Sequence, residues 1–95
     1  MNAKFQWDDV KADRNCRKHG VDFETASEVF EDVFAVEELD PRIENGEYRY
    51  QLIGRGGGKL LTVIYTLRGE IVRIISARQS TRREHERYYR ENSQE

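Results

Sequence analysis

The pattern of apolar and polar positions predicts two short helices in the first third of the chain. A helical repeat runs from Asp8, a suitable N-cap, to Gly20, which can end a helix in the left-handed conformation. A second helix is expected to begin near Asp22, with a stripe of apolar side chains facing the core and glutamates facing outward. The apolar stripe is Phe23, Ala26, Val29 and Phe30, and the outward residues are Glu24, Glu28 and Glu31.

Beyond Val33 the pattern changes to short runs of β-prone residues, which predict an antiparallel sheet of about four strands. The expected strands cover residues 34–39, 48–53, 60–67 and 71–77, and the first is expected to end at Asp40-Pro41. Their connections are too short for parallel crossovers. A charged helix is expected over residues 81–92. The order of two helices, a sheet and a C-terminal helix predicts an α+β fold.

Length and composition restrict the class of protein. At 95 residues, the chain is expected to form a single domain over residues 1–95. The one cysteine, Cys16, excludes an internal disulfide and fits a reducing cytoplasm. No apolar run has the ~20 residues that a membrane span needs, and the first residues do not resemble a signal peptide. We therefore expect a cytoplasmic protein with no membrane partner.

The charges are distributed unevenly along the chain. The net charge is -2, but residues 1–47 carry 6 basic and 13 acidic side chains, whereas residues 48–95 carry 10 basic and 5 acidic ones. Nine of the ten later cations are arginines, whose planar guanidinium suits phosphate. This asymmetry indicates a nucleic-acid partner for the second half.

Neither a cofactor nor a metal is indicated by the remaining motifs. The run of three glycines before Lys59 lacks the first glycine and the Ser/Thr of a phosphate-binding loop, and no helix is expected after it. His19 and His85 are far apart in the sequence, and Cys16 has no persuasive catalytic partner. Because no ligand-spaced cluster of carboxylates accompanies them, we expect no metal site. Cys16 is expected to be a small buried residue.

A group of arginines suggests RNA cleavage without a metal. In such a reaction the ribose 2′-hydroxyl is the nucleophile, and the protein helps to deprotonate it, stabilises charge on the phosphate and protonates the leaving 5′-oxygen. Arginine suits the second task, and histidine, tyrosine or glutamate can serve the proton transfers. The arginines are Arg68 in a turn, Arg73 and Arg78 on the last strand, and Arg82 and Arg83 at the start of the last helix.

Each of these residues also has a purely structural interpretation. Arg73 can be a solvent-facing strand residue, and Arg82 and Arg90 can pair with Glu86 at helical spacing. His19 can be a helix-end residue favoured by the dipole, Glu84 can close a capping box with Thr81, and the tyrosines can mostly pack in the core. Chemistry alone therefore indicates an RNA-binding or an RNA-cleaving domain.

An ordered set of short motifs is more specific, and it spans roughly residues 5–89. The set comprises FQWD at 5–8, KHGVDF at 18–23, VIYT at 63–66, RIISAR at 73–78, and Thr81, Arg83, Glu84 and Tyr88 in the last helix. This set resembles the BrnT toxins of bacterial toxin–antitoxin pairs.

The resemblance implies a fold like that of the RelE ribonucleases and a metal-independent cleavage of RNA that halts translation. It also implies neutralisation by a ribbon-helix-helix antitoxin, BrnA, with two toxins on an antitoxin dimer that supplies all DNA contacts. Arg68 and Arg78 are the residues expected to contact phosphate and to stabilise the transition state. His19, Glu84 and Tyr88 are expected to transfer protons or position RNA, and the expected RNA-binding residues are Lys11, Lys18, Arg82 and Arg83.

Two questions stay open at this point. The chain can be an active toxin endoribonuclease, or it can be a non-catalytic module that binds an antitoxin or RNA. We expect Arg68→Ala and Arg78→Ala each to relieve growth arrest without unfolding the protein. The antitoxin is expected to bind either the acidic first half or the exposed edge of the sheet, and charge reversal at Glu24, Glu28 and Glu31 would test the first option.

Overall fold

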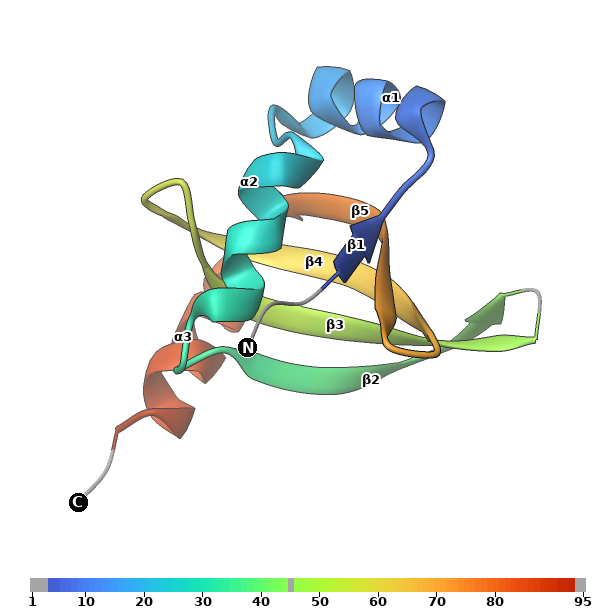
Figure 1. Cartoon of the computed structure of the whole chain (residues 1–95). Helices are drawn as coiled ribbons and strands as arrows, with labels where there is room; N and C mark the ends of the chain where they lie inside the picture. The colour runs from blue at the N-terminus through green and yellow to red at the C-terminus, as the bar shows by residue number, and fades with distance from the viewer. Residues whose placement is uncertain (1–3, 45, 94–95) are drawn as a thin grey trace.

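The computed structural model describes residues 4–44 and 46–93 of the chain as a five-stranded sheet with helices on both faces (Figure 1). The strands lie in the order β1-β5-β4-β3-β2. In chain order the elements are β1 (Lys4–Gln6), α1 (Asp9–His19), α2 (Phe23–Ser27), the 3-10 helix η1 (Glu28–Glu31), β2 (Val36–Glu44), β3 (Glu47–Gly56), β4 (Lys59–Arg68), β5 (Ile71–Gln79) and α3 (Arg82–Glu91).

The α+β class is confirmed, but the sheet differs from the prediction of about four antiparallel strands. A short N-terminal strand, β1, pairs in parallel with β5, with Phe5 opposite Val72. Three residues are too few to show an alternating pattern, so the sequence did not indicate β1. The first predicted strand also continues past Pro41 to Glu44, because β2 is an edge strand and its register with β3 shifts between Asp40 and Ile43.

The ends of the first helix are confirmed in detail. The Asp8 carboxylate accepts hydrogen bonds from the N–H groups of Val10 and Lys11, and Gly20 ends the helix at a φ of 72°. The second predicted helix is instead a five-residue α-helix that continues as η1, so the N-terminal part holds three helical elements rather than two. At the junction the Ser27 hydroxyl donates a hydrogen bond to the Glu24 carbonyl oxygen. Such a side-chain bond competes with the backbone hydrogen bonds of the helix.

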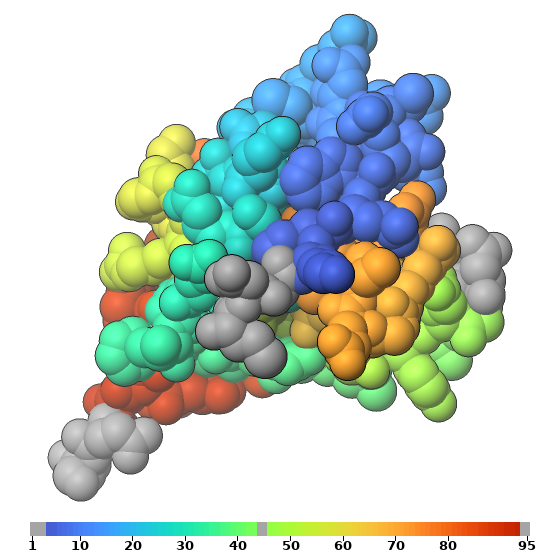
Figure 2. All heavy atoms as spheres, viewed as in Figure 1, coloured from blue at the N-terminus to red at the C-terminus, as the bar shows by residue number. Residues whose placement is uncertain are grey.

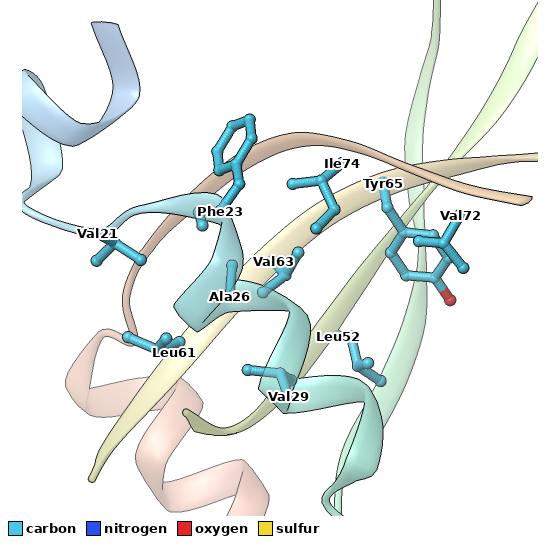
Figure 3. Close-up of a cluster of buried hydrophobic side chains, with 11 residues drawn as sticks. Val21, Phe23, Ala26, Val29, Leu52, Leu61, Val63, Tyr65, Val72 and Ile74 are labelled. Atoms are coloured by element: carbon cyan, nitrogen blue, oxygen red, sulfur yellow. The ribbon is translucent and has the colours of Figure 1, made fainter. Parts of the chain in front are cut away.

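The main core lies between the sheet and the segment formed by α2 and η1 (Figure 3). Phe23, Ala26 and Val29 are buried as the sequence predicts, and Phe30 packs edge-on against Tyr65 at 5.0 Å between ring centroids. A smaller core forms under α3 on the other face of the sheet, from Val36, Ile53, Leu60 and Tyr88. Because both faces are covered at this point, residues 60–66 of β4 are all buried.

A register shift in β5 decides which of its side chains face the core. Ile64 of β4 lies opposite Ser76, whereas the next residue, Tyr65, lies opposite Ile74. Ile75 is therefore an extra residue, and the alternation of β5 changes at this position. As a result Ala77 joins the main core, while Arg78 lies opposite Thr62 on the face that carries α3.

The longest described helix, α1, has 11 residues. Among residues 4–44 and 46–93, no helix combines the length and the apolar character that crossing a bilayer would require.

Candidate functional site

A basic hollow lies between α1 and β5. It has a volume of about 230 Å³, and its walls carry three cations that recur at helical spacing on α1 together with the imidazole of His19. The lining residues are Lys11, Arg14, Asn15, Lys18, His19, Ile75 and Ser76. The structure therefore brings together three of the residues predicted from sequence, Lys11, Lys18 and His19, and adds Arg14, which the sequence analysis had not selected.

Asn15 holds this hollow in place and was not among the site residues predicted from sequence. Its amide nitrogen donates to the carbonyls of Ala77 at 2.8 Å and Val21 at 3.0 Å, and its amide oxygen accepts the N–H of Ala77 at 3.2 Å. The side chain thus bonds both backbone groups of one β5 residue, as a neighbouring strand would. The sequence places this amide on one helical face with Ala12 and His19, and it is part of the BrnT-like pattern at the start of the chain.

Arg78 and Glu84 form the second part of the site. The two guanidinium Nη atoms of Arg78 donate to the two carboxylate oxygens of Glu84 at 2.8 and 2.9 Å, and the pair is partly buried where β5 meets α3. The Thr62 hydroxyl also donates to Glu84, at 2.9 Å, and lies 2.8 Å from the Ser80 hydroxyl. The structure thus brings these two predicted residues into direct contact.

The environment of Glu84 determines which role it can fill. Burial opposes its ionisation, but hydrogen bonds from Arg78, the Thr81 N–H and Thr62 outweigh burial and lower its pKa to about 2. So acidic a carboxylate is a weak proton acceptor at neutral pH. Glu84 also closes the predicted capping box with Thr81. The geometry therefore favours a positioning role, in which Glu84 orients the guanidinium of Arg78.

Tyr88 faces the interior rather than the surface. It is 3% exposed, and its hydroxyl donates to the Asp32 carboxylate at 2.7 Å. Burial and the adjacent Asp32 raise its pKa to about 12. In this arrangement the hydroxyl is not available to an RNA phosphate, so the structure favours packing over the predicted proton transfer. Asp32 also accepts the N–H groups of Phe34 and Arg55, and no sequence signal had marked it.

Arg68 lies at the other end of the β4–β5 ribbon. It is opposite Ile71 next to the hairpin turn, whereas Arg78 is opposite Thr62, six residues earlier in β4. At about 3.4 Å per residue the two arginines are roughly 20 Å apart. Arg68 pairs with Glu47 at 3.1 Å on the exposed surface. At this separation the two arginines do not meet at one phosphate, and the structure does not bring these two predicted residues together.

The two arginines at the start of α3 are exposed and follow Arg78 closely in the chain. Arg82 pairs with Glu86 at 3.4 Å, with both side chains more than half exposed, so that the ion pair contributes little to stability. Arg83 is also exposed. Both side chains are accessible to a ligand that reaches Arg78 from the side of α3.

A metal site would require several ligand side chains close together. In residues 4–44 and 46–93, no three His, Cys, Asp or Glu side chains are grouped as metal ligands would be. Cys16 is exposed, which corrects the expectation that it is buried.

A comparison with known protein families decides the class of this chain. The family described as "Ribonuclease toxin, BrnT, of type II toxin-antitoxin system" matches residues 7–84. The chain belongs to the BrnT family. No curated protein matches the chain.

The BrnT match confirms the resemblance found in the sequence. It runs from the start of the first helix into α3 and includes His19, Arg78 and Glu84, whereas Tyr88 lies beyond it. BrnT proteins are ribonuclease toxins of type II toxin–antitoxin systems, so RNA is the class of substrate and an antitoxin is the class of partner. The match says nothing about which residues act, and their roles depend on the geometry described above.

Proposed function

We propose that this BrnT chain is a metal-independent endoribonuclease that binds RNA along one basic path. The path begins at the hollow under α1, crosses the end of β5 at Arg78 and continues to the start of α3. One observation carries the proposal, namely that Lys11, Arg14, Lys18 and His19 converge on a hollow that contains Ser76. Ser76 is two residues from Arg78 on the same strand, a spacing of about 7 Å.

In the proposed reaction the ribose 2′-oxygen attacks the adjacent phosphorus, and the bond from phosphorus to the 5′-oxygen breaks. A 2′,3′-cyclic phosphate and a 5′-hydroxyl result. The proton of the 2′-hydroxyl has to leave and a proton has to reach the 5′-oxygen. His19 is the side chain on the path whose imidazole can both accept and donate a proton, and Arg78 would stabilise the extra negative charge on the phosphate.

The pairing of Arg78 with Glu84 fits this role. The Arg78 side chain is 31% exposed, so a phosphate can approach the guanidinium from the side that Glu84 does not occupy. Glu84 holds the planar group in one orientation, which reduces the ordering that RNA binding would otherwise require. Lys11, Lys18, Arg82 and Arg83 would then contact phosphates on either side of the cleaved bond.

For the partner we propose a BrnA-like antitoxin of the ribbon-helix-helix class, with two toxins on an antitoxin dimer. The sequence resemblance supports this choice. The antitoxin would supply the contacts with operator DNA.

The alternative is a non-catalytic module that binds RNA or the antitoxin, and one observation favours it. Both terminal nitrogens of Arg78 are already bonded to Glu84, and a fully neutralised guanidinium would stabilise a transition state poorly. The two functions make different predictions for the same assay.

The deciding experiment incubates the purified protein with a defined single-stranded RNA in EDTA. Two variants accompany the wild type, Arg78→Ala and Arg68→Ala, which remove the same group at opposite ends of the same ribbon. We expect the wild type to cleave, Arg78→Ala to be slower by roughly 100-fold or more, and Arg68→Ala to stay within about threefold. The products should end in a 2′,3′-cyclic phosphate.

Other outcomes would change the assignment. An equal loss in both variants would contradict the separation of roles that the geometry indicates. Binding of the RNA without cleavage, on free RNA and on translating ribosomes, would establish the non-catalytic alternative.

A further inference from the structure

Four large apolar side chains are exposed at the end of the sheet that the helices leave uncovered. Leu39 is 53% exposed, Ile43 61%, Tyr48 59% and Leu67 47%. We call these four residues the apolar end patch. Leu39 lies opposite Tyr50, Ile43 opposite Tyr48 and Leu67 opposite Val72. Because residues directly opposite each other share a face, the patch continues the main core, which contains Val72 and is flanked by Tyr50.

The patch is exposed because the helical layer ends before it. Phe30 of η1 packs on Tyr65, and Tyr50 stacks on Tyr65 at 5.4 Å. Tyr48 lies two residues from Tyr50 on β3, towards the hairpin turn. In this direction the β2–β3 and β4–β5 hairpins extend beyond the helices (Figures 1 and 2). Single exposed apolar residues are normal on a protein surface, whereas a group of neighbours indicates a docking surface.

The edge of the sheet beside the patch is open and acidic. β2 is the last strand of the sheet, and between Val36 and Ile43 it carries three acidic residues and one basic residue. Glu38 pairs with Arg87, and Asp40 with Arg42. Glu37 instead accepts a hydrogen bond from the neutral Tyr65 hydroxyl, so the surface next to Leu39 keeps a negative charge. RNA would be repelled here, in contrast to the basic path beside β5 on the other side of the sheet.

We propose that the apolar end patch and the acidic edge of β2 bind a segment of the antitoxin in which apolar side chains are flanked by lysines or arginines. The proposal rests on the antitoxin partner in the proposed function. Charge complementarity selects this occupant over a second copy of the chain. A twofold contact through the patch would bring one acidic β2 edge against another.

The position of the patch separates antitoxin anchoring from RNA cleavage. Leu67 lies opposite Val72, five residues of β4 away from Thr62 and therefore more than about 15 Å from Arg78. A variant of the patch should consequently release the antitoxin without changing the RNA path. This separation allows the two proposals to fail independently.

The test measures binding of the cognate antitoxin proposed above, a BrnA-like protein, by calorimetry on the two purified proteins. The double variant Ile43→Glu, Leu67→Glu places charges in the contact, and we expect its Kd to rise at least tenfold. The matched control is Val10→Glu, because Val10 is also 61% exposed but lies on α1, and its Kd should equal that of the wild type. RNA cleavage by the free double variant should also equal that of the wild type.

Hydrogen exchange of the wild-type complex provides a second measurement that needs no variant. We expect the amides of β2 and of residues 48–50 to become protected when the antitoxin binds. Unchanged exchange there, or a wild-type Kd for the folded double variant, would overturn the proposal. A dimer of the free chain that the double variant dissociates would also overturn it, in favour of a second copy. Tight antitoxin binding through the patch by a protein that does not cleave RNA would support it and would contradict the nuclease proposal alone.

Discussion

At the scale of single residues, Glu84 performs two tasks with one carboxylate. One oxygen accepts the Thr81 N–H and so caps α3, and the same group binds the guanidinium of Arg78. Sequence reasoning identified the cap because Thr81 and Glu84 have the spacing of a capping box. It could not distinguish a capping residue from a catalytic one, because both roles use the same side chain at the same position.

The ionisation of Glu84 predicts a pH dependence of stability. Its pKa in the folded protein is about 2, below the ~4.3 of an ordinary glutamate. A lowered pKa contributes stability that is present above the unfolded value and is lost as the pH falls towards the folded value. We expect Glu84→Gln to reduce the free energy of unfolding by about 1–3 kcal/mol at pH 7, and the difference from wild type to shrink between about pH 5 and pH 2.

Urea unfolding of wild type and variant at several pH values measures this difference. Glu86→Gln is the control, because Glu86 is an exposed helix residue paired with Arg82, and it should have little effect at any pH. A constant difference between Glu84→Gln and wild type across the range would show that the ionisation of Glu84 contributes nothing.

At the scale of elements, the central feature is how α1 is attached to β5. The pairing of β1 with β5 ends at Gln6 and Arg73, so β1 does not cover the rest of this edge. At Ala77 the amide of Asn15 replaces the missing strand. The same contact fixes α1 and therefore the positions of Lys11, Arg14 and Lys18 around the hollow.

Removing this amide should destabilise the protein and disturb the hollow together. Asn15→Ala deletes four hydrogen bonds and leaves the backbone groups of Ala77 without the Asn15 amide in a buried position, so we expect a loss of about 2–4 kcal/mol. Chemical unfolding measures the loss, and faster exchange of the Ala77 amide locates it. Asp13→Ala, a neighbouring exposed position, should change the stability little. Wild-type stability of Asn15→Ala would mean that packing alone holds α1.

At the scale of the whole molecule, the two signs of charge lie at opposite edges of the sheet. The cations of α1, Arg78 and the start of α3 gather where β5 ends, whereas the acidic strand β2 forms the opposite edge of the sheet. This separation explains how a chain with a net charge of -2 can present a basic surface to RNA. The net charge alone conceals it.

Salt dependence of RNA binding tests the basic path. For single-stranded RNA each phosphate contact adds about 0.7 to the slope of log K against log salt concentration. We therefore expect Lys11→Ala, Lys18→Ala to lower the slope by about 1.4. Arg17→Ala should leave the slope unchanged, because Arg17 is paired with Asp13 outside the hollow. Equal slopes for all three proteins would place the RNA elsewhere.

The sequence by itself determined the features that depend on neighbours in the chain. Asp8, Gly20 and Thr81 mark helix ends because capping involves groups only a few residues apart. The dense apolar runs predicted β4 and β5, and the ordered motifs indicated the BrnT family, which the family match confirms.

Only the tertiary structure decided which residues meet across the sheet. Asn15 reaches Ala77, 62 residues later, and the extra residue at Ile75 determines the face on which Arg78 lies. Long-range pairing likewise separates Arg68 from Arg78 and turns Tyr88 towards Asp32. Such contacts depend on strand register and on how the layers pack, and no local pattern of side chains encodes either of these alone.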